Sequence, residues 1–201
     1  MRSFIALDLP AEARRAAAQV ADGLKNCGAD VKWVRPQAMH LTLKFLGEVD
    51  PGRVGELSRG LEAACRGVEA LEMELSGCGA FPGLARPQVI WVGLAGELDP
   101  LRRLAAAVEQ QMQALGFAPE RRPFKPHLTL GRVRRGRKGR RGGKGGQGGM
   151  AELKRRLAGL ASWRGVRFTA GKLALFESTL TPQGAIYRVL HQIDLPAGQG
   201  R

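Results

Sequence analysis

Cysteine is scarce in this 201-residue sequence, which has only Cys27, Cys65 and Cys78, without a C-x-x-C spacing. That odd number disfavours a disulfide framework or a zinc site and favours a reducing compartment. No apolar run approaches about 18 residues, which disfavours a membrane-spanning helix. The apolar run at the amino terminus is short and is interrupted by Asp8, so we expect no signal peptide. These absences predict a cytoplasmic protein with no contact with a membrane.

Acidic residues are also few, with 18 Asp and Glu against 32 Lys and Arg, which gives a net charge of +14. A basic chain attracts polyanions at long range, although a solvated basic surface explains the same composition. Glycine and basic residues dominate residues 134–149, which cannot bury enough apolar surface to form a packed element. We expect a mobile loop there. Its positive charge could attract RNA, but we favour the interpretation that it is a surface insertion, because long loops cost little stability.

Several enzyme signatures are absent. The chain has neither the G-x-x-x-x-G-K-[ST] motif of a P-loop nor the G-x-S-x-G motif of a nucleophile elbow. Carboxylates do not cluster near either of the histidine motifs described below, which argues against a two-metal phosphatase. We expect no metal and no cofactor.

Histidine is rare as well, yet two of the three histidines lie in copies of one tetrapeptide, His40-Leu41-Thr42-Leu43 and His127-Leu128-Thr129-Leu130. The alternation of polar and apolar residues predicts a β-strand. On a strand the histidine and threonine point to the same face, roughly 6.6 Å apart at Cα, and the leucines point to the other. Two such strands facing each other would place two imidazoles and two hydroxyls around one cleft.

Paired histidines suit acid–base chemistry on a phosphate ester. A neutral imidazole can take a proton from an attacking water while a protonated one gives a proton to the leaving alkoxide. Each role contributes about 10²–10⁴ in rate. The hydroxyls of Thr42 and Thr129 can donate hydrogen bonds to the non-bridging oxygens, where charge develops.

The pattern along the chain predicts a repeated order of elements. Helices are expected at about 10–25, 51–66, 99–115 (Asp99 as N-cap) and 150–160. Strands are expected at 2–9, 31–35, 38–46, 71–76, 87–94, the second histidine motif, 166–170, 172–180 and 185–195, with a loop at 80–87. Because each half delivers its histidine motif after a helix, we expect one domain over residues 1–201, made of two lobes related by an approximate two-fold axis.

Longer stretches around these motifs carry a family resemblance. They are Phe4-Ile5-Ala6-Leu7-Asp8, Trp33-Val34-Arg35-Pro36, His40 to Gly47, Phe81-Pro82, Trp91-Val92-Gly93-Leu94, Pro126 to Arg132, and Leu175 to Gly184 followed by Tyr187. Over nearly its full length the chain resembles the RNA 2′,3′-cyclic phosphodiesterases of the two-histidine (2H) phosphoesterase superfamily, also called the 2′-5′ RNA ligase family.

The resemblance implies a bilobal α+β fold with antiparallel sheets, helices and a central cleft. It also implies hydrolysis of a terminal RNA 2′,3′-cyclic phosphate to a 2′-phosphomonoester, without ATP, and the reverse 2′-5′ ligation. His127 would activate the water and His40 would protonate the leaving 3′-oxygen. Thr42 and Thr129 would hold the phosphate, and Arg132 would add a positive contact.

Other residues and functions stay open at this stage. Phe45 and Trp33 could stack on a nucleobase, although aromatic residues on strands more often belong to the core. Lys44 points opposite to Leu43 and could line the cleft, although we expect it to be solvated. We expect His191 to have no catalytic role. One alternative function is an RNA-binding module that uses the Arg/Gly loop beside an idle cleft. Another is a related enzyme for a different cyclic or 2′-5′ linked nucleotide. We expect a monomer.

Overall fold

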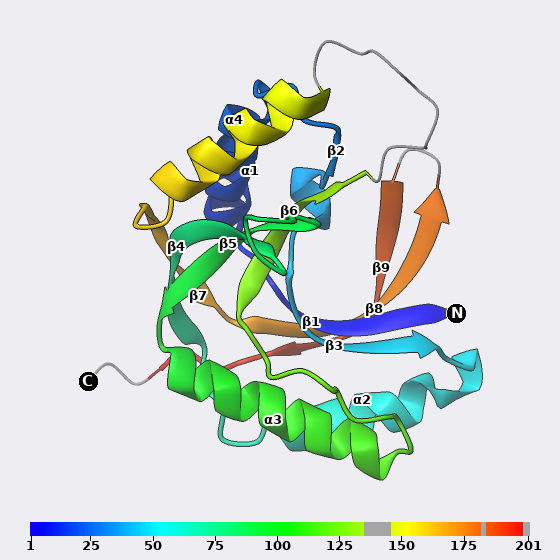
Figure 1. The fold of residues 1–201 in the computed structure, drawn as a ribbon. Helices are drawn as coiled ribbons and strands as arrows, with labels where there is room; N and C mark the ends of the chain where they lie inside the picture. Colours follow the sequence, from blue (N-terminus) through cyan, green and yellow to red (C-terminus); the bar gives the residue numbers. More distant parts are fainter. Residues whose placement is uncertain (135–145, 182–183, 199–201) are drawn as a thin grey trace.

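The computed structural model describes residues 1–134, 146–181 and 184–198 and contains two antiparallel sheets (Figure 1). The first, sheet A, has the order β3 (Leu41–Glu48), β1 (Arg2–Asp8), β8 (Lys172–Thr181), β9 (Gly184–Asp194). The second, sheet B, has the order β2 (Val31–Trp33), β6 (His127–Val133), β5 (Val89–Gly96), β4 (Leu71–Phe81), β7 (Arg164–Ala170). The predicted α+β fold class is confirmed.

Helices cover the outer faces of both sheets (Figure 1). They are α1 (Ala11–Lys25), α2 (Val54–Ala64), α3 (Leu98–Ala114) and α4 (Gly146–Gly159), with short 3₁₀ turns η1 (Pro36–Ala38) and η2 (Pro51–Arg53). Helices α1 and α4 contact strands of sheet B, whereas α2 contacts β9 and α3 contacts β3 in sheet A. Buried Ala13, Ala17, Ala21 and Leu24 recur at helical spacing on α1, so the helix buries one apolar stripe against the core.

The chain repeats one connection in each lobe. Strand β1 leads through α1 to β3 and pairs with it, just as β5 leads through α3 to β6 and pairs with it. Each connecting helix reaches the sheet of the other lobe, because α1 contacts β6 and β7 while α3 contacts β3. The repeat expected from the sequence is present, and this exchange of helices interlocks the two lobes.

Some predicted boundaries are wrong near proline and glycine. Residues 36–38 form a 3₁₀ turn, so β3 begins at Leu41 and His40 precedes the strand. Proline at the first position fixes the φ angle that such a turn needs. Asp99 lies in the first turn of α3, whose N-cap is Glu97. Strand β4 continues to Phe81, through the start of the loop predicted at 80–87.

Part of the segment predicted as a loop over 134–149 is helical. Helix α4 begins at Gly146, so the end of the predicted loop and the predicted helix start at Met150 are both wrong. Glycine is required at position 149 of this helix, because a Cβ there would lie 2.5 Å from the backbone carbon of Gly28. Only glycine allows so close an approach between the two backbones. Residues 135–145, the remainder of that prediction, lie outside the described residues.

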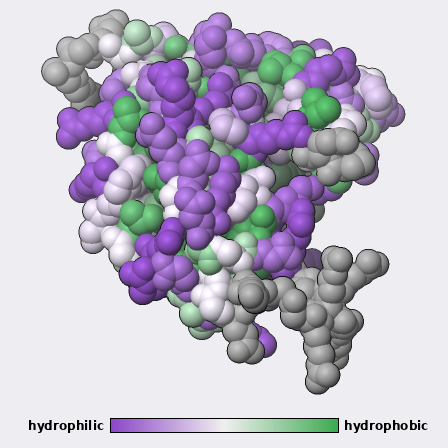
Figure 2. Space-filling view, turned by 90° about the horizontal axis from the view of Figure 1, so that it is seen from above, coloured by the Kyte–Doolittle hydropathy of each residue, from purple (hydrophilic) through white to green (hydrophobic). Residues whose placement is uncertain are grey.

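The surface is mainly hydrophilic where it is seen from above (Figure 2). Hydrophobic side chains on that face form separate small patches, which are normal on a protein surface and need no partner. Among the described residues, no helix is both long enough and apolar enough to cross a membrane.

Candidate active site

Both histidine-motif strands contain a β-bulge at the same position of the motif. On β3, Thr42 lies opposite Ala6 and Lys44 opposite Ile5, which leaves Leu43 as the extra residue. An extra residue reverses the alternation of side chains between the two faces of a strand. Lys44 and Phe45 therefore lie on the faces opposite to those expected from simple alternation.

Strand β6 repeats this arrangement. Thr129 lies opposite Trp91 and Gly131 opposite Ile90, so Leu130 is the extra residue. We call the face of each sheet that carries the motif threonine, Thr42 on sheet A or Thr129 on sheet B, the site face. Each bulge returns the third residue after the threonine to the site face.

Because of the bulges, the side chains of Phe45 and Arg132 lie on the site face. Both side chains are exposed, and the ring of Phe45 has an exposed fraction of 57%. Lys44 goes the other way and has an exposed fraction of 1%. Its Nζ donates to Glu109 Oε2 at 2.7 Å and to the carbonyl oxygen of Ala118 at 3.0 Å. The expectation that Lys44 is solvated is therefore wrong, because the bulge turns it toward α3.

His40 is held by its backbone neighbour and by aromatic rings. Its Nδ1 lies 3.0 Å from the carbonyl oxygen of Ala38. A carbonyl can only accept, so Nδ1 carries a proton and donates it, and Nε2 is the nitrogen left free to take up or give a proton. The ring stacks on Phe4 at 4.5 Å between centroids and meets Tyr187 edge-on at 5.1 Å. Burial among these rings lowers the pKa of His40 to about 4.

His127 is oriented in the same way. Its Nδ1 donates to the carbonyl oxygen of Lys125, again two residues earlier, at 2.7 Å. The ring of Phe81 meets the imidazole edge-on at 4.9 Å. Burial lowers the pKa of His127, and the nearby charge of Arg132 lowers it further. Both histidines therefore present Nε2 and favour the neutral form in the free protein.

Arg132 and Tyr187 connect the two lobes at this site. Burial raises the pKa of Tyr187, while the nearby charges of Arg132 and Arg2 lower it. Arg132 thus lies within electrostatic range of His127 on its own sheet and of Tyr187 on the other, and Tyr187 contacts His40. Strands β3 and β6 also contact each other. The two motifs therefore belong to one site.

The sequence did not identify the aromatic floor beneath His40. Phe4 and Phe176 are register partners on β1 and β8, and their rings stack at 5.1 Å. Tyr187 on β9 packs edge-on against Phe4 at 5.0 Å. These residues come from opposite ends of the chain, so only strand pairing brings them together. The stretches that carry the family resemblance contain all three, but nothing in those stretches shows that the rings meet at His40.

Of the two interpretations that the sequence leaves open for Trp33, base stacking or a place in the core, the packing agrees with the core. Trp33 pairs with Gly131, and a Cβ on Gly131 would lie 3.0 Å from the Trp33 ring. Gly131 follows the bulge and faces away from Thr129, so the ring lies on the other face of sheet B, against the core. Of the two aromatic candidates, Phe45 alone reaches the site face.

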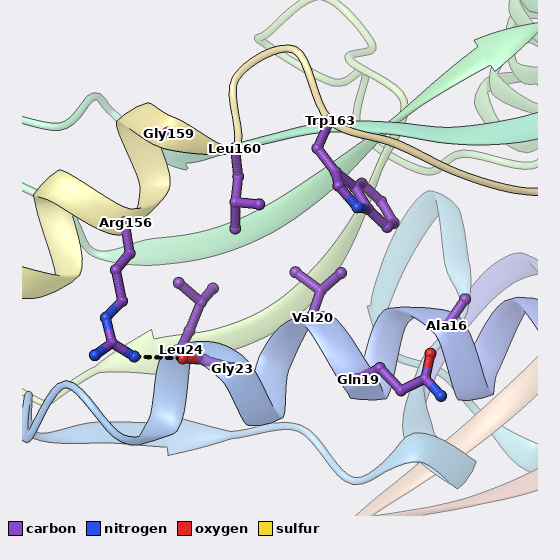
Figure 3. Close-up of a pocket in the computed structure, with 9 residues that line it drawn as sticks. All are labelled: Ala16, Gln19, Val20, Gly23, Leu24, Arg156, Gly159, Leu160 and Trp163. Carbon is purple, nitrogen blue, oxygen red and sulfur yellow. Dashed lines mark hydrogen bonds between the residues drawn. The ribbon is translucent and has the colours of Figure 1, made fainter.

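A separate cavity of about 490 Å³ lies between α1 and α4 and contains neither motif histidine (Figure 3). Val20, Leu24 and Leu160 line it, and Arg156 donates through Nη1 to the carbonyl oxygen of Gly23 at 2.6 Å. Since it has no acid–base pair, the cavity does not offer the chemistry that the histidine site does.

Comparisons with known proteins agree with this geometry. The family model "LigT like Phosphoesterase" matches residues 7–91 and 92–187, and each stretch contains one H-x-T motif. An RNA 2′,3′-cyclic phosphodiesterase of Aeropyrum pernix is 34% identical over 184 residues, which cover 92% of this chain and 97% of that protein. Another, from Thermotoga maritima, is 30% identical over 198 residues, covering 98% and 97%.

Solved structures of other proteins are similar to this chain in fold. A protein of Thermus thermophilus has a TM-score of 0.72 and 26% identity, and the match covers 98% of this chain and 99% of that one. The structure of E. coli LigT complexed with 3′-AMP has a TM-score of 0.68 and 25% identity, with coverage of 96% and 97%.

Proposed function

The chain belongs to the LigT-like phosphoesterase family, and from that premise we propose that it hydrolyses the terminal 2′,3′-cyclic phosphate of RNA to a 2′-phosphomonoester. The observation that carries the proposal is the repeated motif geometry. Two H-x-T motifs with matching bulges each present an imidazole, and Arg132 lies close enough to His127 and to Tyr187 of the other sheet for its charge to lower the pKa of both. The curated relatives that bear this enzyme name match the chain over more than nine-tenths of its length.

The proposed reaction needs one proton transfer at each histidine. Nε2 of neutral His127 takes a proton from water as its oxygen bonds to phosphorus, and the bond from phosphorus to the 3′-oxygen breaks. Nε2–H of protonated His40 supplies the proton for that oxygen. Thr42, Thr129 and Arg132 stabilise the charge that develops on the non-bridging oxygens.

The surroundings of His40 suit a general acid. Burial on Phe4 makes its imidazolium a stronger acid than free imidazolium, with a pKa of about 4. The negative charge of a bound phosphodiester favours the protonated form, so the substrate itself helps to load His40 with the proton that it later gives up.

The pH dependence of kcat/KM tests this arrangement, because it reports the pKa values of the free enzyme. The pKa values of both histidines lie below the ordinary 6.5, and that of His40 is about 4. Since one group must be charged and the other neutral, we expect maximal kcat/KM below pH 6.5 and a decline of about tenfold per pH unit well above it. Far-UV circular dichroism at each pH monitors folding. An optimum near pH 8 would contradict the assignment.

Phe45 is proposed to stack on the base of the terminal nucleotide. Base stacking on an aromatic ring is worth about 1–3 kcal/mol, so Phe45→Ala should raise KM for a cyclic nucleotide about tenfold and change kcat little. Ile186→Ala is the matched control, since Ile186 is also 57% exposed but faces away from Tyr187, beside Thr179. Equal KM values for the two variants would remove the stacking role.

Product analysis tests the proposed reaction directly. The substrate is cytidine 2′,3′-cyclic phosphate with EDTA present, and chromatography separates the 2′- and 3′-phosphates. We expect the 2′-phosphate, whereas a 3′-phosphate product or no turnover would refute the proposal. Because the same residues catalyse the reverse step, we also propose 2′-5′ ligation when a 5′-hydroxyl RNA replaces water.

The setting of the enzyme is part of the proposal. Cys27, Cys65 and Cys78 are buried free thiols, which suits a reducing compartment. We propose that the protein acts in the cytoplasm as a monomer, which size-exclusion chromatography with light scattering would test.

A further inference from the structure

Lys32 and Arg132 form an unusual cross-strand pair at the edge of sheet B. They lie directly opposite each other on β2 and β6, and both side chains are exposed. Like charges directly opposite each other destabilise a sheet. Within the part of the chain that the structure describes, neither side chain has a hydrogen bond or an ion pair, so no acidic group compensates for the repulsion.

The other charged pairs in the two sheets differ from this one. Five register pairs join opposite charges: Arg2–Glu48, Asp8–Lys172, Glu74–Arg167, Lys172–Asp194 and Glu177–Arg188. Lys32–Arg132 is the one like-charged pair among the register partners of the described strands. A lysine that merely protects an edge strand from pairing needs no second cation opposite it. The positive charge of this pair is uncompensated, and a bound anion would neutralise it.

The pair faces the site. A Cβ on Gly131 would point at the side chains of Val31 and Trp33, which places those residues on the core face of sheet B. Lys32 and Arg132 alternate with them and therefore lie on the site face, together with Thr129. Adjacent strands are roughly 4.8 Å apart, so Lys32 extends the positive charge of Arg132 by one strand toward the sheet edge, away from β5.

We propose that Lys32 binds the internucleotide phosphate on the 5′ side of the terminal nucleotide, while Arg132 serves the cyclic phosphate. This subsite rests on the proposed function, and it assigns the substrate class as an RNA end of two or more nucleotides. The phosphodiester supplies the negative charge that the cross-strand pair lacks. A mononucleotide has no such phosphate and therefore gains nothing from Lys32.

Two substrates measured with one variant test the subsite. The variant is Lys32→Gln, and the substrates are cytidine 2′,3′-cyclic phosphate and the dinucleotide CpC with a 2′,3′-cyclic end. A hydrogen bond to a charged group is worth about 1.5–3 kcal/mol, so we expect kcat/KM for the dinucleotide to fall about tenfold or more. Turnover of the mononucleotide should stay within about twofold, by the same argument.

Controls separate this effect from others. Lys172→Gln removes the same charge from another strand lysine, which has acidic partners, and should leave the preference for the dinucleotide unchanged. Lys32→Arg should restore most of that preference. An equal loss on both substrates, no loss on the dinucleotide, or the same loss in Lys172→Gln would overturn the subsite. Failure of the wild-type protein to hydrolyse either substrate would instead refute the proposed function.

Discussion

Replacing His127 or His40 by alanine is expected to lower kcat for a nucleoside 2′,3′-cyclic phosphate by about 10²–10⁴. His127→Ala removes the proposed acceptor of the proton from water, and His40→Ala removes the proposed donor of the proton to the leaving oxygen. Neither substitution should unfold the protein, because each imidazole makes one hydrogen bond to a nearby carbonyl and is only partly buried. Steady-state hydrolysis with EDTA present measures the loss.

The third histidine provides the control. His191 on β9 lies opposite Leu175 and points toward Glu62 of α2, with Nε2 3.3 Å from Oε1 of that residue. It therefore faces away from the site, and His191→Gln should keep wild-type kcat within about twofold, because no proton transfer is assigned to it. If His40→Ala and His127→Ala kept the turnover of His191→Gln, the acid–base assignment would fail.

Removing the buried charge of Lys44 is expected to cause the largest loss of stability. Lys44 is 1% exposed and pairs with Glu109, while its ammonium also donates to Ala118. Breaking a buried pair by removing one partner costs about 3–5 kcal/mol. We expect Lys44→Ala to lower the free energy of unfolding by about that amount, measured by urea denaturation with circular dichroism detection.

A surface pair of similar length isolates the effect of burial. Lys25 Nζ lies 2.6 Å from Asp22 Oδ1 with both side chains exposed, so Lys25→Ala should cost less than about 1 kcal/mol. Lys44→Met keeps an apolar stem and separates lost packing from lost pairing. Equal stability losses for Lys44→Ala and Lys25→Ala would show that the buried pair contributes nothing beyond an exposed one.

The same lysine marks the limit of prediction from a strand pattern. Simple alternation places residue 44 with Thr42, but the bulge at Leu43 brings Phe45 there instead and turns Lys44 toward α3. A bulge is defined by the register between two strands, so β1 must be paired before the face of Lys44 is decided. The sequence leaves two interpretations open for Trp33 for a related reason, because its face depends on its pairing with Gly131.

What the sequence determined by itself is the chemistry and the order of elements. Each H-x-T motif needs only three consecutive residues to place a histidine and a threonine side by side, and its repetition after a helix predicts the two lobes. Tertiary structure decided the rest: the aromatic floor of Phe4, Phe176 and Tyr187, the exchange of α1 and α3 between lobes, and the like-charged Lys32–Arg132 pair. These features join residues that are distant in sequence, and strand register and helix packing alone bring them together.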